Sequence, residues 1–226
     1  MLPCWVVRVG TMDYGAALSL QRSLLTARRS GMIDNVLLLI EHPPTYTIGR
    51  RLKAREHLLY SKEELESRWI SLYEADRGGD ITYQGPAQLV GYTIFDISVW
   101  YRDVFKFLRD LEVVIIRVLD DFEIKAHCTK GLTGVWVGDG KVAALGVKVS
   151  RWIAMHGFSL NINPDLNMYE GIVPCGIHNR AVVSLESILE RAVLTEEVST
   201  SVLHHLGEVF HMSFEETNLS NLLQKI

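Results

Sequence analysis

The stretch TGVWVGDGKVAALGVKVSRWIAMHGFSLNIN, at residues 133–163, carries the strongest fold signal in the chain. It contains a Gly-Asp-Gly turn at residues 138–140, and the runs VWV and KVAALGVKV flank this turn. Runs of β-branched residues on either side of a glycine turn are typical of a β-hairpin. A further extended run follows at residues 155–163. We therefore expect a hairpin followed by another strand.

Outside this stretch, predicted strands and predicted helices are interspersed. Strands are expected in MLPCWVVRVG, NVLLLIEHPP, TYTIG and on both sides of the turn in ADRGGDITYQGPAQLVGYTIFDI. Helices are expected at residues 13–29 with Asp13 as the N-cap, from the capping box at residues 61–64, at residues 104–119 and 185–189, and after Thr195. Hairpins with appended helices favour an α+β fold, in one domain of residues 1–226, over a doubly wound sheet.

The composition limits the class of protein. With 226 residues, 48% hydrophobic and 22% charged, the chain is neither disordered nor mainly a coiled coil. A net charge of -4 gives no general case for nucleic-acid binding, and the apolar runs are too short for a membrane span. Cys4, Cys128 and Cys175 are too few and too scattered for a disulfide framework or a zinc site. The N-terminus lacks a targeting pattern, so we expect a cytoplasmic protein; the alternative is a mitochondrial or plastid matrix protein whose transit peptide has been removed.

Two side chains are candidates for catalysis. Cys175 lies between Pro174 and Gly176, on a constrained turn where the glycine allows close approach of a ligand to the backbone. An ammonium on an apolar strand face must be paired or lose its proton. Lys141 opens the run KVAALGVKV, in phase with Ala143, Leu145, Val147 and Val149. Considered singly, a buried structural thiol and a lysine that reaches solvent are the commoner interpretations.

The histidines allow both functional and structural interpretations. His42 precedes two prolines at a strand end, where functional loops often begin, but such a residue can also be purely structural. His204 and His205 lie on a predicted helix and are interpreted as surface or rim residues. Alternation along its strand predicts that His156 is a hydrogen-bonded core histidine on the same face as Phe158, Leu160 and Ile162.

Two further segments suggest ligand contacts. Arg77-Gly78-Gly79-Asp80 can shape a substrate loop, although it lacks the spacing of a phosphate-binding loop. On a chain with net negative charge, a local excess of cations makes an acidic partner plausible, although most such clusters are simply solvated surface. We call this excess the basic cluster, and it consists of Arg50, Arg51, Lys53 and Arg55.

Taken together, five segments resemble the octanoyltransferase family of lipoate biosynthesis, the lipoyl(octanoyl) transferases. They are LLLIEHPPTYTIGR, DRGGDITYQGPAQLVGY, TGVWVGDGKVAALGVKVSRWIAMHGFSLNIN, GIVPCGI and VSLESIL. They occur in the family's order and cover roughly residues 36–190. The resemblance implies the fold of lipoate-protein and biotin-protein ligases, a mixed β-sheet flanked by helices. The chain departs from the family's usual YHGPGQ loop at Gln84 and Ala87.

The resemblance also implies roles for individual residues. Cys175 corresponds to the nucleophile that accepts the acyl group, and Lys141 to the lysine that activates the thiol and handles protons. His42 and His156 are expected as supporting residues. No metal ligand is expected. The expected substrate-binding residues are Arg77, Gly78, Gly79, Asp80, Ile81, Thr82, Tyr83, Gln84, Ala144, Leu145, Gly146, Gly157, Phe158 and Ser159.

The implied reaction moves an octanoyl group from octanoyl-acyl carrier protein to a lysine of a lipoyl-accepting domain, through a cysteine thioester. The implied acceptors are the lipoyl domains of 2-oxoacid dehydrogenase E2 subunits and the glycine cleavage H protein. A thioester is already activated, so no cofactor is expected. We further expect a monomer, an acyl tunnel lined by apolar side chains around Leu145 and Phe158, and docking of the acidic carrier on the basic cluster. The alternatives are an ATP-dependent lipoate or biotin ligase on the same fold, and a non-catalytic relative that binds acyl carrier or lipoyl domains.

Overall fold

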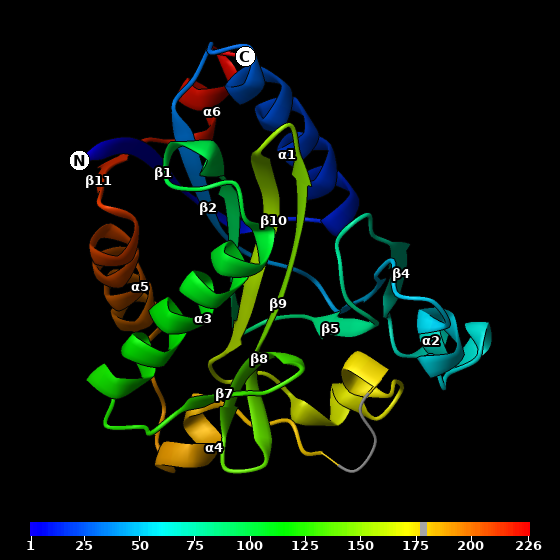
Figure 1. Ribbon diagram of the computed structural model, residues 1–226. Helices are drawn as coiled ribbons and strands as arrows, with labels where there is room; N and C mark the ends of the chain where they lie inside the picture. The colour runs from blue at the N-terminus through cyan, green and yellow to red at the C-terminus, as the bar shows by residue number, and fades with distance from the viewer. Residues whose placement is uncertain (177–179) are drawn as a thin grey trace.

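A computed structural model describes residues 1–176 and 180–226 (Figure 1). Within these residues, eight strands form a mixed sheet in the order β11-β1-β2-β6-β10-β9-β8-β7. Strand β1 is parallel to both β2 and β11, and the other neighbours are antiparallel. The strands are β1 (Leu2–Thr11), β2 (Asn35–Glu41), β6 (Gln88–Ile94), β7 (His127–Thr129), β8 (Leu132–Val137), β9 (Gly140–Ser150), β10 (Ile153–Asn161) and β11 (Met212–Glu216). The predicted mixed sheet and the hairpin of β8 and β9 are confirmed.

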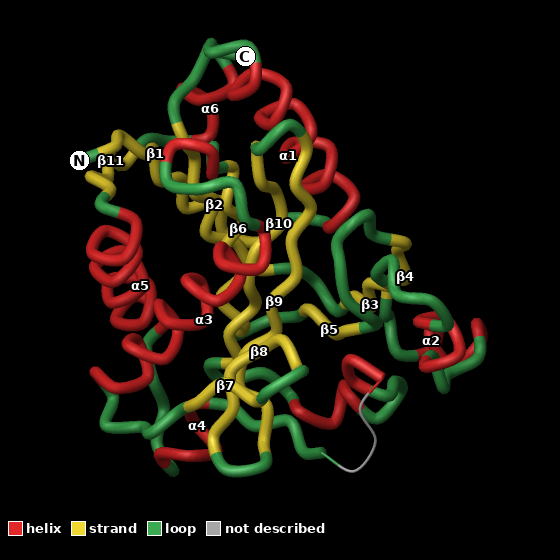
Figure 2. Tube along the Cα trace, in the orientation of Figure 1, coloured by secondary structure: helices red, strands yellow, loops and turns green. Residues whose placement is uncertain are grey.

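Helices cover both faces of this sheet. On one face α3 (Val104–Asp121), α4 (Leu185–Leu189) and α5 (Thr195–Phe210) pack against the strands, and α3 and α5 also contact each other. On the other face lie α1 (Tyr14–Arg29) and α6 (Leu219–Leu223). The N-cap predicted at Asp13 is confirmed, because its side chain accepts the Ala16 N–H. The two faces bury two separate apolar clusters, and the tube in Figure 2 shows the sheet between them.

A second, smaller sheet lies beside the large one (Figure 2). It has the order β4-β3-β5, formed by β3 (Thr45–Ile48), β4 (Ser71–Glu74) and β5 (Thr82–Gln84). Helix α2 (Lys62–Ser67) packs against β4, and the predicted capping box of Ser61 and Glu64 is present. Short 3-10 turns complete the fold at Ala54–His57, Ile97–Val99, Leu166–Tyr169 and Pro174–Gly176. No helix among the described residues is long and apolar enough to cross a membrane.

A β-bulge in β9 changes the face on which Lys141 lies. Val135 pairs with Ala143, but its neighbour Trp136 pairs with Lys141, so Val142 is an extra residue in β9. Because Val135 and Trp136 point to opposite faces of β8, Ala143 and Lys141 also point to opposite faces. The prediction that Lys141 is in phase with the apolar residues of its strand is therefore wrong.

A second irregularity changes the face on which His156 lies. Phe158 and Leu160 pack in the cluster with α3 and α5, as predicted. His156, however, has a φ of 61°, which breaks the alternation of β10. Its backbone N–H donates to Gln21 of α1, and its ring packs edge-on against Tyr92. The predicted shared face is therefore wrong for His156, which lies on the α1 side of the sheet.

Candidate active site

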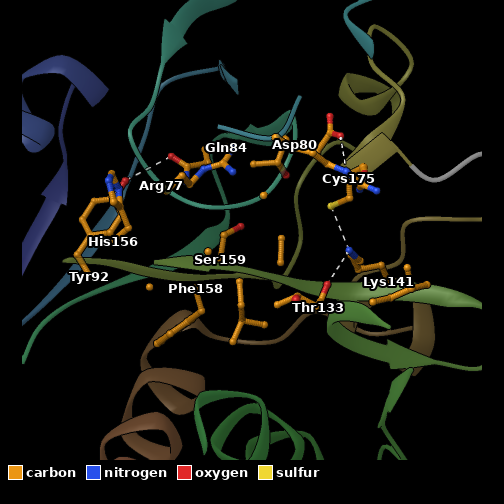
Figure 3. A pocket seen from close by; sticks show the side chains of 18 of the residues that line it. Arg77, Asp80, Gln84, Tyr92, Thr133, Lys141, His156, Phe158, Ser159 and Cys175 are labelled. Carbon is orange, nitrogen blue, oxygen red and sulfur yellow. Dashed lines mark hydrogen bonds and ion pairs between the residues drawn. The ribbon is translucent and has the colours of Figure 1, made fainter. Parts of the chain in front are cut away.

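A cavity of about 200 Å³ lies between the large sheet and the loop before β5 (Figure 3). Strands β9 and β10 form one wall, and the turn Pro174–Gly176 brings Cys175 to the opposite side. The predicted site residues that line it are Arg77, Gly79, Asp80, Thr82, Gln84, Lys141, Ala144, Leu145, Gly146, His156, Gly157, Phe158, Ser159 and Cys175. Segments far apart in the sequence are therefore brought to one cavity.

The thiol of Cys175 and the amine of Lys141 are in direct contact. Lys141 Nζ lies 3.0 Å from Cys175 Sγ and 3.1 Å from the carbonyl oxygen of Thr133. Lys141 Nζ also lies over the ring of Trp136, 4.7 Å from its centroid. Only 6% of Lys141 is exposed, and none of its described partners is a carboxylate. The predicted proximity of Cys175 and Lys141 is confirmed.

Glycine at position 134 leaves the room that the Lys141 side chain occupies. Gly134 lies on β8 with a φ of 133°. A Cβ atom here would lie 2.9 Å from the carbonyl oxygen of Ala143, 3.0 Å from Lys141 Cε and 3.2 Å from Lys141 Nζ. Its backbone N–H donates to Glu112, a buried carboxylate of α3. This backbone position therefore helps to set where the amine lies.

The turn that carries Cys175 is strained and held by several hydrogen bonds. Cys175 has a φ of 58°, a conformation uncommon for residues other than glycine. Its N–H donates to the carbonyl oxygen of Ile81, and Arg51 Nη1 donates to its carbonyl oxygen at 3.2 Å. The predicted constrained turn is confirmed. Ile177, the last residue of the GIVPCGI segment, lies outside the described residues.

The pair of His57 and Asp80 packs directly against this turn. His57 Nδ1 lies 2.7 Å from Asp80 Oδ1, which also accepts the Ile81 N–H. A Cβ atom on Gly176 would lie 2.6 Å from His57 Cε1 and 2.7 Å from Asp80 Oδ2. Only glycine fits at position 176 with this pair in place. His57 was not a predicted site residue, because a single histidine next to the basic cluster forms no pattern that reveals its tertiary contact.

Arg77 fixes the glycine loop against both sheets. Its buried guanidinium donates to the carbonyl oxygen and the hydroxyl of Thr47, each at 2.8 Å, and burial lowers its pKa. The Gly78 N–H donates to the carbonyl oxygen of Val147 on β9. Gly146 on the same strand lets the loop approach, since a Cβ there would lie 2.8 Å from the Gly78 oxygen. The loop is therefore a fixed wall of the cavity.

Three of the predicted substrate-binding residues contribute no side chain to the cavity wall. Ile81 and Tyr83 belong to the apolar core of the small sheet. Alternation along this segment turns Thr82 and Gln84 to the cavity and the other two away from it. Gly78 contributes its backbone contact to β9 rather than a cavity wall. The side chains of Ile81 and Tyr83 therefore do not line the cavity, although the Ile81 carbonyl oxygen accepts the Cys175 N–H.

His42 supports the site from behind. It is fully buried, and burial lowers its pKa. Because the Met12 carbonyl 2.7 Å away can only accept, Nδ1 carries the hydrogen, and Nε2 faces the Tyr92 hydroxyl at 2.7 Å. Tyr92 Oη in turn lies 3.4 Å from Oε1 of Gln84 at the cavity wall. His42 thus contacts Tyr92, which itself lines the cavity, as a supporting residue would.

His156 lines the cavity as a neutral imidazole. Its Nε2 lies 2.8 Å from Asp76 Oδ1, and burial lowers the pKa of His156 to about 4. Burial alone would raise the pKa of Asp76, but hydrogen bonds from Lys148 and His156 outweigh this effect and hold it well below its ordinary value. This cluster fixes one end of the cavity.

His204 and His205 lie on α5 and are not among the residues that line the cavity. His204 is exposed, as predicted. His205 is buried and bonds to Asp121 of α3 at 2.9 Å, so its interpretation as a surface or rim residue is wrong. The periodicity of apolar residues along α5 does not reveal that the end of α3 packs beside His205.

The apolar part of the wall is shared with the main core. Leu145 and Phe158 line the cavity and also belong to the cluster under α3 and α5. The Phe158 ring occupies the space above Gly91, where a Cβ atom would lie 2.2 Å from its Cζ. Ser159 and Gln84 add polar groups to the wall. The expected apolar tunnel stays a prediction.

The basic cluster divides between the cavity and the surface. Arg51 lines the cavity, contacts the Cys175 carbonyl and lies 3.8 Å from Asp80. Arg55 forms an exposed ion pair with Glu74, and Lys53 forms one with Glu56. One member of the cluster therefore reaches the nucleophile.

Comparison with known proteins places this geometry in context. The model of the lipoyl protein ligase A/B catalytic domain matches residues 13–207. The chain is 47% identical over 189 residues to an octanoyltransferase of Cytophaga hutchinsonii, covering 81% of this chain and 77% of the relative. It is 43% identical over 210 residues to an octanoyltransferase of Caldicellulosiruptor bescii, covering 92% of each chain.

Solved structures share the fold at low sequence identity. Lipoate-protein ligase A bound with ATP aligns with a TM-score of 0.79 at 15% identity, covering 97% of this chain and 90% of that chain. Biotin protein ligase from Aquifex aeolicus, in complex with biotin and ATP, aligns with a TM-score of 0.56 at 15% identity, covering 93% and 70%. The predicted fold relationship to these ligases is confirmed.

Proposed function

The chain belongs to the lipoyl protein ligase A/B catalytic domain family, and on this premise we propose that Cys175 carries the acyl group while Lys141 moves the protons. The protein is an acyltransferase, an octanoyltransferase of protein lipoylation. The observation that carries the assignment of residues is the 3.0 Å contact between Lys141 Nζ and Cys175 Sγ in the cavity wall. A thiol needs a neighbouring group that takes its proton or stabilises its thiolate, and this amine can do both.

In the first half-reaction the thiol proton moves to Lys141, and the Cys175 thiolate attacks the thioester carbon of octanoyl-acyl carrier protein. A bond forms between this carbon and Cys175 Sγ, and the bond to the carrier sulfur breaks. Lys141 returns its proton to the departing carrier thiolate. The products are the octanoyl-enzyme thioester, the carrier thiol and a neutral Lys141 amine.

In the second half-reaction an acceptor lysine replaces the Cys175 sulfur. Its ammonium gives one proton to Lys141, and the free amine attacks the octanoyl carbon. A carbon–nitrogen bond forms, the bond to Cys175 breaks, and the second nitrogen proton neutralises the thiolate. The proton on Lys141 then passes to solvent. The lipoyl domains of 2-oxoacid dehydrogenase E2 subunits and the glycine cleavage H protein are the proposed acceptors.

The glycine loop is the proposed site for the oxyanion. The backbone N–H groups of Cys175 and Gly176 already donate to the carbonyl oxygens of Ile81 and Val173. The loop that contains Gly79 lines the same cavity as Cys175, and glycine has no side chain in the way at that position. Fixed backbone donors at such a place stabilise developing charge more than water does.

The basic cluster is the proposed docking surface for the acyl carrier protein. Arg51 lies at the cavity beside Cys175, and the exposed Arg50 and Lys53 continue from it along the chain. An acidic carrier would be steered here, and complementary charge acts mainly on the association rate. Reversing Arg50 and Lys53 to glutamate should raise the KM for the carrier and weaken its salt dependence, but spare turnover of a small octanoyl thioester.

Lys141→Ala tests the role of the amine. Acylation of Cys175 by a small octanoyl thioester at pH 7 should slow by at least about 100-fold, the usual range for losing a general base. Lys125→Ala, which removes an exposed lysine from a loop, is the matched control and should keep the wild-type rate. An acylation rate in Lys141→Ala equal to that of the control would reject the proposal.

An ATP-dependent ligase on the same fold is the alternative enzyme. Its acyl-adenylate chemistry uses no cysteine nucleophile, so transfer would persist in Cys175→Ala and would require ATP and free octanoate. The cysteine–lysine contact supports the thioester route. It also supports an enzyme over a relative that only binds carrier or lipoyl domains. Octanoyl transfer from the carrier without ATP is expected only of the transferase, transfer of free octanoate with ATP only of the ligase, and neither of a relative that only binds.

A further inference from the structure

Asp80 places a carboxylate oxygen without a hydrogen bond next to the nucleophile. Oδ1 accepts the Ile81 N–H and lies 2.7 Å from His57 Nδ1. Oδ2 is buried, and within the described residues it accepts no hydrogen bond. It faces Gly176, because a Cβ atom on that glycine would lie 2.7 Å from it. Oδ1 therefore holds the local structure, whereas Oδ2 has no hydrogen-bond partner among the described residues.

The cation nearest to Oδ2 is held loosely. Arg51 Nε lies 3.8 Å from Oδ2, beyond hydrogen-bond distance, while Nη1 donates to the Cys175 carbonyl. The Arg51 side chain is 59% exposed, whereas the Asp80 side chain is 1% exposed. Burying an ionised carboxylate is costly unless a cation and hydrogen bonds compensate it. Among the described residues, no arginine or lysine therefore hydrogen-bonds Oδ2, although Arg51 contacts Cys175 beside it.

The two substrates differ in what they could bring to this oxygen. The octanoyl thioester is neutral at its reacting end. The acceptor lysine arrives as an ammonium, whose three N–H donors suit an unpartnered carboxylate oxygen. Arg51, which lines the cavity and donates to the Cys175 carbonyl, lies beside the thioester that this ammonium has to reach.

We propose that Asp80 is the receptor for the acceptor lysine, with Oδ2 accepting a hydrogen bond from its ammonium after Arg51 has moved aside. This inference rests on the proposed function and names the group that recognises the second substrate. Asp80 binds and orients the cation. The proton still passes to the neutral Lys141 amine, so the balance of the second half-reaction is unchanged. His57 contacts Oδ1 and so keeps Oδ2 oriented toward the turn Pro174–Gly176.

Asp80→Asn tests this role because it removes the charge but can keep an oxygen acceptor for the Ile81 N–H. The enzyme is first loaded with octanoate from a small octanoyl thioester, and loss of the adduct is then followed by intact mass at pH 7. Two nucleophiles are compared: N-acetyl-lysine amide, an ammonium, and hydroxylamine, which is neutral at this pH. Asp139→Asn, which removes an exposed carboxylate in the β8–β9 turn, is the matched control.

We expect Asp80→Asn to form the adduct and to react with hydroxylamine within about twofold of wild type, but to react with the lysine amide at least about tenfold more slowly. N-acetyl-arginine amide, a cation with N–H donors that is not nucleophilic at pH 7, should slow the attack of the lysine amide on the wild-type adduct, a result that does not depend on folding of the variant. Equal slowing of all three reactions in Asp80→Asn, or no slowing, overturns the inference. Absence of any adduct in wild type instead rejects the proposed function itself.

Discussion

Lys141 Nζ lies 3.0 Å from Cys175 Sγ although the two residues are 34 positions apart in the chain. Two departures from regular backbone produce this contact. The bulge at Val142 turns Lys141 to the cavity face of β9, and the left-handed conformation of Cys175 presents the thiol from the opposite wall. Strained or irregular backbone of this kind often occurs at functional sites.

Gly134→Ala should impair the site without replacing either reactive residue. The new Cβ would lie 3.0 Å from Lys141 Cε and 2.9 Å from the Ala143 oxygen, at a φ that alanine rarely adopts. Displacing the amine should slow acylation of Cys175 by at least about tenfold, since small misplacements of catalytic groups are costly. Gly138→Ala, with a φ of 54° and an open surrounding, is the matched control and should react at the wild-type rate. Equal acylation rates in the two variants would show that the position of Lys141 does not depend on Gly134.

The features that could be predicted from sequence are those set by neighbouring residues. The N-cap at Asp13, the capping box at Ser61 and the hairpin turn at residues 138–140 each depend on local hydrogen bonds and backbone preferences. The periodicity of apolar residues likewise predicted the helix at residues 104–119, which the structure shows as α3.

The features that could not be predicted depend on pairing between distant segments. The face of Lys141 follows from a register shift against β8, and period two alone assigns the wrong side. His156 leaves its predicted face because its backbone adopts a positive φ between two well-paired strands. The contact of His57 with Asp80 joins residues 23 apart that share no motif. The identities of the candidate site residues could therefore be predicted from the sequence, but the directions in which their side chains point could not.

Gln84→His should change turnover only slightly. Gln84 lines the cavity and meets Tyr92, but it takes no part in the contact between Lys141 and Cys175. An amide cannot titrate, so the wild-type residue can only position substrate or shape the wall. We expect kcat with octanoyl-acyl carrier protein to rise by less than about tenfold, or ~1.4 kcal/mol of barrier. A rise of several hundredfold would instead show that a titrating histidine is needed at this position.

Ala87→Gly should stabilise the fold. Ala87 has a φ of 60°, and a left-handed residue with a Cβ costs roughly 1–2 kcal/mol. The added freedom of glycine in the unfolded chain offsets about 0.4–1 kcal/mol of the gain. The free energy of unfolding, measured with urea, should therefore rise by about 0.5 kcal/mol. Ala126→Gly, at a position without a positive φ, should lower it. A destabilised Ala87→Gly would mean that the methyl group packs favourably.

Acid should destabilise the protein through His156. An unfolded histidine titrates near pH 6.5, whereas burial lowers the pKa of folded His156 to about 4. Between these values the unfolded state binds more protons, so stability falls as the pH falls through this window. From pH 7 to 4.5 the free energy of unfolding should drop by about 2 kcal/mol from this residue.

His156→Asn should remove that part of the pH dependence, because asparagine does not titrate and tolerates the positive φ. His204→Asn, at an exposed histidine of α5, is the matched control and should keep the wild-type slope. Urea unfolding at the two pH values gives the comparison. Identical slopes in His156→Asn and wild type would mean that this imidazole is protonated in the folded state.

The central claim is that the octanoyl group passes through a thioester on Cys175, and intact-mass spectrometry after incubation with octanoyl-acyl carrier protein tests it most directly. Wild type should gain the mass of one octanoyl group in a form that hydroxylamine removes and that a lipoyl domain discharges. Cys175→Ala should gain nothing, while Cys128→Ala, the control at an exposed thiol, should gain the same mass as wild type. An octanoyl adduct that forms in Cys175→Ala, or octanoyl transfer that proceeds in that variant at the wild-type rate, would contradict the claim.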